Sequence, residues 1–140
     1  MLGRKPQMQN MRLIEGGLTL SNIPPAPNWL NERAKFIWRT TAVELIERQT
    51  LGEGDLGTLA NYCAVNSIVQ ELSGEVDAEG LFEHSERSKT SRPAAAFKSL
   101  MQSMMVSARL AAELGLSPAS RNKAAKVAAT NEDEADDLLA

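Results

Sequence analysis

The side chains best suited to chemistry in this 140-residue chain are bases in short groups. Their guanidinium and ammonium groups donate hydrogen bonds to phosphate oxygens, so each group is a candidate contact for DNA. Charged loops and helix ends are also commonly just solvated, and that alternative stays open. The candidate phosphate contacts are Arg87, Lys89, Arg92, Arg121, Lys123 and Lys126, with Arg4, Lys5 and Arg12 of the N-terminal leader ranked second.

A net charge of −3 hides a strong segregation of charge along the sequence. Residues 86–126 hold eight bases and two acids, whereas residues 13–85 hold four bases and eleven acids. The segment from Val127 onward holds five acids and no base. Because electrostatic fields are local and screened over roughly 10 Å, a protein that is acidic overall can still present a basic surface to phosphates.

Residue patterns typical of an enzyme are missing from the sequence. It has no glycine-rich phosphate loop, no Cys or His pair at ligand spacing and no nucleophile elbow. Cys63 lies among apolar residues, which favours a buried structural thiol, and the single histidine, His84, is interpreted as a surface residue. We therefore predict a protein that is not an enzyme and that uses no metal and no cofactor.

Composition favours one small helical domain. Leu, Ala and Met dominate the apolar residues, while aromatic residues make up 4% of the chain. No apolar run approaches the length of a membrane span, and the first residues lack the hydrophobic core of a signal peptide. A single cysteine cannot form an internal disulfide, so a reducing cytoplasm is the expected compartment.

The strongest helix signal runs over residues 93–114. Pro93 suits the first turn of a helix, and apolar residues then recur at spacings of three and four, which predicts a broad apolar face. Gly115 is suited to closing this helix in the left-handed conformation. Ser117 and Pro118 predict the cap and first residue of a further, basic helix over residues 118–129. The residues expected to carry packing or an oligomer interface are Phe97, Met101, Met104 and Ala108.

The first half of the chain predicts another pair of helices. One spans residues 28–49, with Asn28 as its cap and Trp29 and Trp38 as core anchors; the other spans residues 55–73 and is capped by Asp55. The predicted fold class is therefore all-α, with two helical hairpins (about four helices) in one domain over residues 28–129. The flanking segments are expected to be a flexible basic and proline-rich leader (1–27), a mobile connection (74–91) and an acidic disordered tail (130–140).

One run and a set of spaced residues form a recognisable pattern: ELGLSPASR at residues 113–121, together with Ala34, Trp38, Leu45, Leu51, Asp55, Leu59, Tyr62 and Cys63. In these residues the sequence resembles the short all-helical small-subunit terminases of tailed phages. The resemblance implies a packaging accessory that recognises viral genome DNA, forms a ring and regulates a large subunit carrying the ATPase and nuclease. Its implied partners are double-stranded viral DNA, the terminase large subunit and further copies of itself, in the host cytoplasm.

Assembly also follows from the size of the apolar face on residues 93–114. Two helical hairpins are too small to bury all of it, so part of it is expected to contact a neighbouring subunit, and head-to-tail contacts that close form a ring. Two other functions stay open. A helical transcriptional regulator would place the helix after Ser117 in the major groove, and an adaptor would bind a partner through the methionines without nucleic acid.

Overall fold

The computed structural model describes residues 11–14 and 17–139, with side chains from Leu18 onward. The predicted contacts Arg4 and Lys5 lie outside these residues, and so does the side chain of Arg12. Along the chain the elements are β1 (Met11–Ile14), β2 (Gly17–Leu20), α1 (Glu32–Glu47), the single 3-10 turn η2 (Glu53–Asp55), α2 (Leu56–Glu79), β3 (Phe82–Ser85), β4 (Thr90–Pro93), α3 (Ala95–Glu113) and α4 (Pro118–Leu139).

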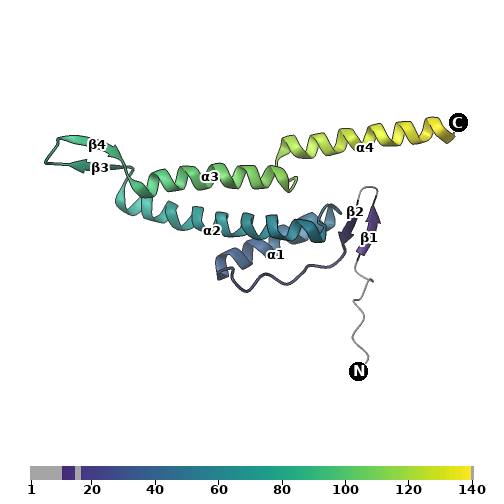
Figure 1. The fold of residues 1–140 in the computed structure, drawn as a ribbon, viewed down its shortest axis with the longest axis horizontal. Helices are drawn as coiled ribbons and strands as arrows, with labels where there is room; N and C mark the ends of the chain where they lie inside the picture. Colours follow the sequence, from purple (N-terminus) through teal and green to yellow (C-terminus); the bar gives the residue numbers. More distant parts are fainter. Residues whose placement is uncertain (1–10, 15–16, 140) are drawn as a thin grey trace, which may run out of the picture.

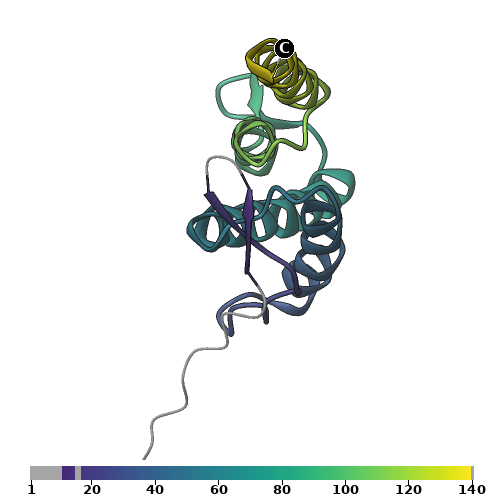
Figure 2. The same ribbon diagram turned by 90° about the vertical axis from the view of Figure 1, so that its right-hand side faces the viewer.

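Helix α2 is the centre of the fold, because α1 and α3 both pack against it from different sides (Figures 1 and 2). The β3–β4 hairpin projects from one end of the α2–α3 pair, where the chain turns from α2 into α3. Helix α4 leaves the other end and extends away from the body (Figure 1). The molecule is therefore elongated, with the hairpin and the end of α4 at opposite extremes.

The core lies between α1, α2 and the turn that joins them. Trp38, Leu45 and Leu59 are fully buried there, and the small side chains of Ala34 and Ala42 let the helices approach closely. Burying apolar side chains of this size contributes about 1.5–3 kcal/mol each. This cluster is the main source of stability that the contacts identify.

Only one of the two tryptophans anchors this core. Trp38 is 1% exposed, and its Nε1–H donates a hydrogen bond to the carbonyl oxygen of Pro24 at 2.9 Å. That bond holds the extended segment Ile23–Pro27 against α1. Trp29 is 64% exposed, so the prediction that it anchors the core is wrong; the neighbouring Leu30 is buried instead.

Helix α1 begins later than the sequence predicted, because Asn31 and not Asn28 is its cap. The Asn31 Oδ1 atom accepts hydrogen bonds from the Ala34 amide at 2.8 Å and from the Ser67 hydroxyl at 2.9 Å. A single amide oxygen thus satisfies the first turn of α1 and the buried hydroxyl of α2. The helix start and the α1–α2 packing are coupled through it.

The strands are a departure from the predicted all-α fold, although the chain is mostly helical. The leader holds the antiparallel pair β1–β2, and the Leu20 amide donates to the Leu51 carbonyl at 2.8 Å, which attaches this pair to the turn after α1. The predicted mobile connection holds the rest of α2 and the β3–β4 hairpin. Every residue of β3 and β4 is exposed, so no apolar alternation marked them in the sequence.

The second half of the chain also differs from the prediction of a second helical hairpin. Pro93 pairs with Phe82 in the β-hairpin, so α3 begins at Ala95 and not at residue 93. The break at Gly115 (φ 73°) and the Ser117 cap, whose hydroxyl accepts from the Ser120 amide at 3.2 Å, are confirmed.

Helix α4 runs to Leu139 instead of ending at residue 129, so the predicted disordered tail over residues 130–139 is helical. None of its residues is buried, because α4 extends away from the body and does not fold back on α3 as a hairpin would (Figure 1).

The two tryptophans provide a matched test of this packing. Trp38→Ala should lower the free energy of unfolding by about 3–5 kcal/mol, because it removes a fully buried ring and its hydrogen bond. Trp29→Ala should change it by less than about 0.5 kcal/mol, because that ring is exposed. Urea denaturation followed by circular dichroism at 222 nm measures both, and equal losses would contradict the assigned core.

Candidate functional site

The first predicted basic group lies on the β3–β4 hairpin. Arg87 and Lys89 occupy the turn at its tip and are exposed. Arg92 lies on β4 opposite Glu83, with its Nη2 atom 3.1 Å from the carboxylate. Both partners are largely exposed, so the pair contributes little stability and Arg92 can exchange this carboxylate for a phosphate at small cost.

The second predicted group lies on the first half of α4. Arg121, Lys123 and Lys126 are all exposed, and no carboxylate of the described residues forms an ion pair with them. At about 100° per residue, Lys123 and Lys126 lie on neighbouring faces of the helix and Arg121 lies on the opposite side. The three bases therefore surround the root of α4 and do not form a single row.

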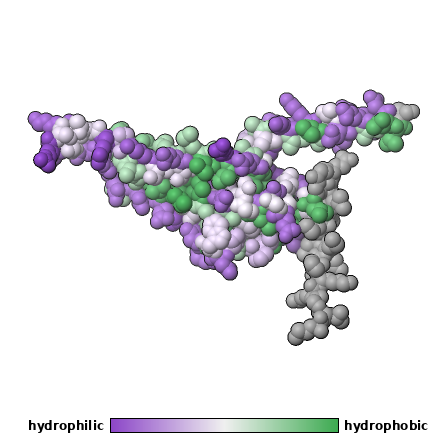
Figure 3. Space-filling model, viewed as in Figure 1, coloured by the Kyte–Doolittle hydropathy of each residue, from purple (hydrophilic) through white to green (hydrophobic). Residues whose placement is uncertain are grey.

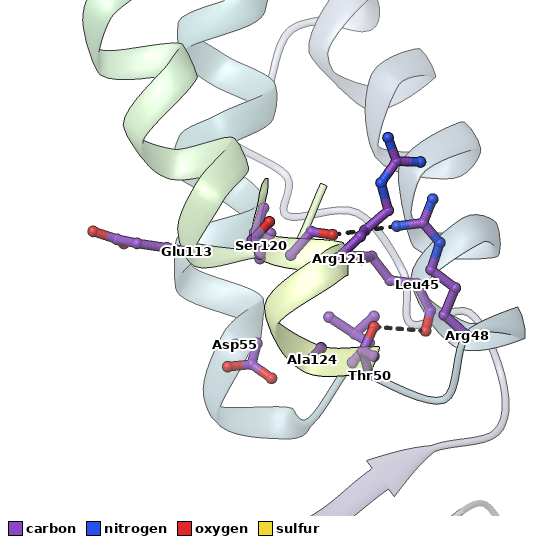
Figure 4. Close-up of a pocket in the computed structure, with 11 residues that line it drawn as sticks. Leu45, Arg48, Thr50, Asp55, Glu113, Ser120, Arg121 and Ala124 are labelled. Atoms are coloured by element: carbon purple, nitrogen blue, oxygen red, sulfur yellow. Dashed lines mark hydrogen bonds between the residues drawn. The ribbon is translucent and has the colours of Figure 1, made fainter. Parts of the chain in front are cut away.

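A base that the sequence analysis missed lies beside this group. Arg48, at the end of α1, donates from Nη1 to the Gly115 carbonyl at 3.3 Å and from Nη2 to the Glu44 carboxylate. Arg48 and Arg121 line the same pocket, of about 360 Å³, and Figure 4 shows both guanidinium groups on one side of it while Glu113 points away. In the sequence Arg48 lies four residues after Glu44, which is a spacing typical of an ion pair within one helix. Nothing therefore indicated that Arg48 would contact Gly115.

The fold keeps the two basic groups apart. The hairpin lies at one end of α3 and the root of α4 at the other (Figure 1). Helix α3 has 19 residues, which corresponds to a length of about 28 Å at 1.5 Å per residue. The predicted phosphate contacts of one chain therefore form two separate sites.

The predicted interface residues lie on α3, which α2 covers on one side only. Leu100 and Leu114 face inward and are buried, and Phe97 is partly buried at the border. On the outer flank Met101 and Met104 are each 40% exposed and Met105 is 75% exposed; Ala108 is also exposed. Figure 3 shows hydrophobic side chains gathered over the α2–α3 region in the middle of the molecule. We call the surface formed by Met101, Met104, Met105 and Ala108 the methionine face.

The groups with potential for catalysis are not brought together. Cys63 is fully buried, and burial raises the pKa of its thiol to about 12, so the thiolate is strongly disfavoured at neutral pH. His84 is exposed on β3, opposite Ser91. Among the described residues no cluster of three or more His, Cys, Asp or Glu side chains is arranged to hold a metal ion.

The described helices include none that is both long enough and apolar enough to cross a membrane.

Comparison with known proteins places the chain in a family. The family model described as "Phage terminase, small subunit" matches residues 34–131, which is well over half of the chain. No curated protein and no solved structure matches it. This protein therefore belongs to the phage terminase small-subunit family, as its sequence resemblance had indicated. The matched range contains α1 to α3 and the basic half of α4.

The burial of Cys63 has a direct chemical consequence. A pKa near 12 instead of the ordinary 9.0 lowers its thiolate fraction at pH 8 by about a thousandfold. The thiol of the folded protein should therefore react with a disulfide reagent much more slowly than the thiol of the urea-unfolded chain. Absorbance at 412 nm with a nitrobenzoate disulfide follows the reaction, and equal rates in the two states would contradict the burial.

Proposed function

We propose that this chain is a DNA-binding, ring-forming accessory of viral genome packaging that acts in the host cytoplasm. In this role it recognises the viral genome and regulates the ATPase and nuclease of the terminase large subunit, and it does no chemistry itself. The observation that carries the proposal is the match to the terminase small-subunit family over residues 34–131. The methionine face and the distribution of bases support its two physical parts, assembly and DNA binding.

The methionine face supports assembly. Exposed methionines that share one side of α3, opposite the side that packs against α2, form an apolar patch rather than scattered surface residues. Methionine side chains are flexible and polarizable, so they adapt well to a facing surface. A second copy is the partner that we propose, with Phe97, Met101, Met104 and Ala108 at the interface. We propose that this face meets a different surface of the next copy, because such a head-to-tail contact can close into a ring.

The separation of the bases supports binding by repetition. One chain offers Arg87, Lys89 and Arg92 at one end and Arg121, Lys123 and Lys126 at the other, and each group alone is a weak site for phosphates. A ring repeats each group once per subunit, so that weak contacts add up along one duplex. The resulting affinity is mainly electrostatic and falls steeply as salt is raised.

The first test of this proposal removes the bases of α4. The triple variant Arg121→Ala, Lys123→Ala and Lys126→Ala should bind duplex DNA more weakly and with a shallower dependence of log K on log[salt], because about 0.9 counterions are released per phosphate contact. Fluorescence anisotropy with a labelled duplex at several salt concentrations measures both quantities. Arg39→Ala, an exposed base on α1, is the control and should leave the affinity nearly unchanged. Unchanged affinity in the triple variant would move the DNA site elsewhere.

The second test places a charge on the methionine face. Met101→Glu should shift the protein from oligomer to monomer, because the contact would have to bury an unpaired carboxylate. Gln102→Glu adds the same charge at the next position of the same helix, off the methionine face, and should leave the oligomer intact. Size-exclusion chromatography with light scattering reports the mass, and circular dichroism checks that both variants are folded. An oligomer that survives in Met101→Glu would remove the methionine face from the interface.

A further inference from the structure

A groove runs between α4 and the ends of α1 and α3. It encloses about 850 Å³, and its apolar wall consists of Ala124, Val127 and Ala128 of α4 together with Ala112 of α3. The pocket beside Arg48 and Arg121 (Figure 4) continues it, since Arg48, Thr50 and Ala124 line both spaces. We call this combined space the α4 groove. No element of the described chain fills it, although its wall is apolar.

The α4 groove is bordered by bases whose charge is only partly used. Arg121 and Lys123 line it and form no ion pair within the described residues, and Arg48 reaches it from the end of α1. Three acids also line it: the Asp55 carboxylate accepts a hydrogen bond from the Gly52 amide, Glu113 points away from Arg48 and Arg121 in Figure 4, and Glu132 lies farther along α4. An occupant with apolar side chains for the wall and carboxylates for these bases would complement the groove.

The far end of α4 has this composition. Leu138 and Leu139 are each 87% exposed, and Glu134, Asp136 and Asp137 precede them with no base nearby. The charges also oppose the helix dipole, because α4 carries its bases in the first half and its acids in the last turns. The acids at the end of α4 therefore interact unfavourably with the dipole of their own helix, and cations from outside the helix would stabilise them.

Glu132 and Ala135 line the outer part of the groove in their own chain, but a chain cannot place Leu138 and Leu139 on the wall near Ala124. Ala124 and Leu138 are 14 positions apart in one continuous helix, which separates them by about 21 Å. Figure 1 shows α4 extending away from the body, with its last turns far from α1. An occupant with this sequence has to come from a second copy.

We propose that residues 136–139 of one copy dock in the α4 groove of the next copy. The leucines lie on the wall formed by Ala124, Val127 and Ala128, and the carboxylates face Arg48, Arg121 and Lys123. The inference rests on the proposed head-to-tail assembly and adds to it a second contact between subunits, distinct from the methionine face. The acidic segment is then a connector between copies.

Disulfide trapping tests the docking in the full-length protein. Single variants Ala124→Cys and Leu138→Cys are mixed and exposed to a mild oxidant, and linked dimers are measured by non-reducing electrophoresis. In the matched control, Ala125→Cys takes the place of Ala124→Cys in the mixture. Ala125 is the next residue of the same helix and lines neither of the two pockets that form the α4 groove. The buried Cys63 is present in every sample, so the wild-type chain reports any background.

The proposal predicts several-fold more linked dimer from the Ala124→Cys and Leu138→Cys mixture than from the Ala125→Cys mixture. Equal yields from a wild-type protein that is oligomeric by light scattering would overturn the docking and leave the proposed ring in place. A wild-type protein that is monomeric and gives no link would overturn both, and the mass distinguishes this case from the first. A link from Ala124→Cys to added large subunit, and none to a second copy, would assign the groove to that partner and overturn the proposal.

The second measurement uses side chains that contribute nothing to the fold of one chain. Leu138→Ser with Leu139→Ser should raise several-fold the protein concentration at which the oligomer half-dissociates, because the apolar part of the contact is lost. An unchanged dissociation curve would contradict the docking, since both residues are 87% exposed in the single chain and cannot act through its stability.

Discussion

The packing of α3 mainly against one helix, α2, determines most of what this molecule can do. Leu100 is the buried residue of α3, and Leu114, just past its end, joins the core around Trp38, while the methionines on the outer flank remain 40–75% exposed. One neighbouring helix cannot cover an apolar face of this width on the 19-residue α3, and α4 does not pack over the remainder. One chain thus buries the core around Trp38 but leaves a second apolar surface, the methionine face of α3, exposed.

The charged residues are also separated along the length of the molecule. The bases of the hairpin and those of α4 lie at opposite ends of α3, and the acids of α4 lie farther out still. Within one chain these charges do not neutralise each other, apart from local pairs such as Arg92 with Glu83. In the proposed head-to-tail arrangement the acidic end of one α4 would meet the basic root of the next, so the segregation along the sequence would become complementarity between subunits. Such an assembly would suit the family's role in genome packaging, because each basic group would be repeated once per subunit and one duplex would contact several copies of it.

The sequence allowed the mostly helical class, the family and the break after α3 to be predicted because each has a local cause, whereas the start of α3 was placed too early because Pro93 pairs with Phe82 in the β-hairpin. Gly115 and Ser117 act through their own backbone and side chain, and the period of the apolar residues on α3 is visible without knowledge of the rest of the fold. The β3–β4 hairpin was missed because its strands are polar and fully exposed, so pairing and not burial defines them. Asn31 replaced Asn28 as a cap because Ser67, distant in sequence, binds the same oxygen. Arg48 was missed for a similar reason, as its contact with Gly115 joins residues 67 positions apart.

The central claim is that the outer flank of α3 is covered by further copies of the chain. Native mass spectrometry of the purified full-length protein tests it most directly. One chain has a mass of 15.2 kDa, and the account predicts a discrete closed species at a whole-number multiple of that mass, larger than a dimer. A spectrum that contains only the 15.2 kDa chain at micromolar concentration would contradict it.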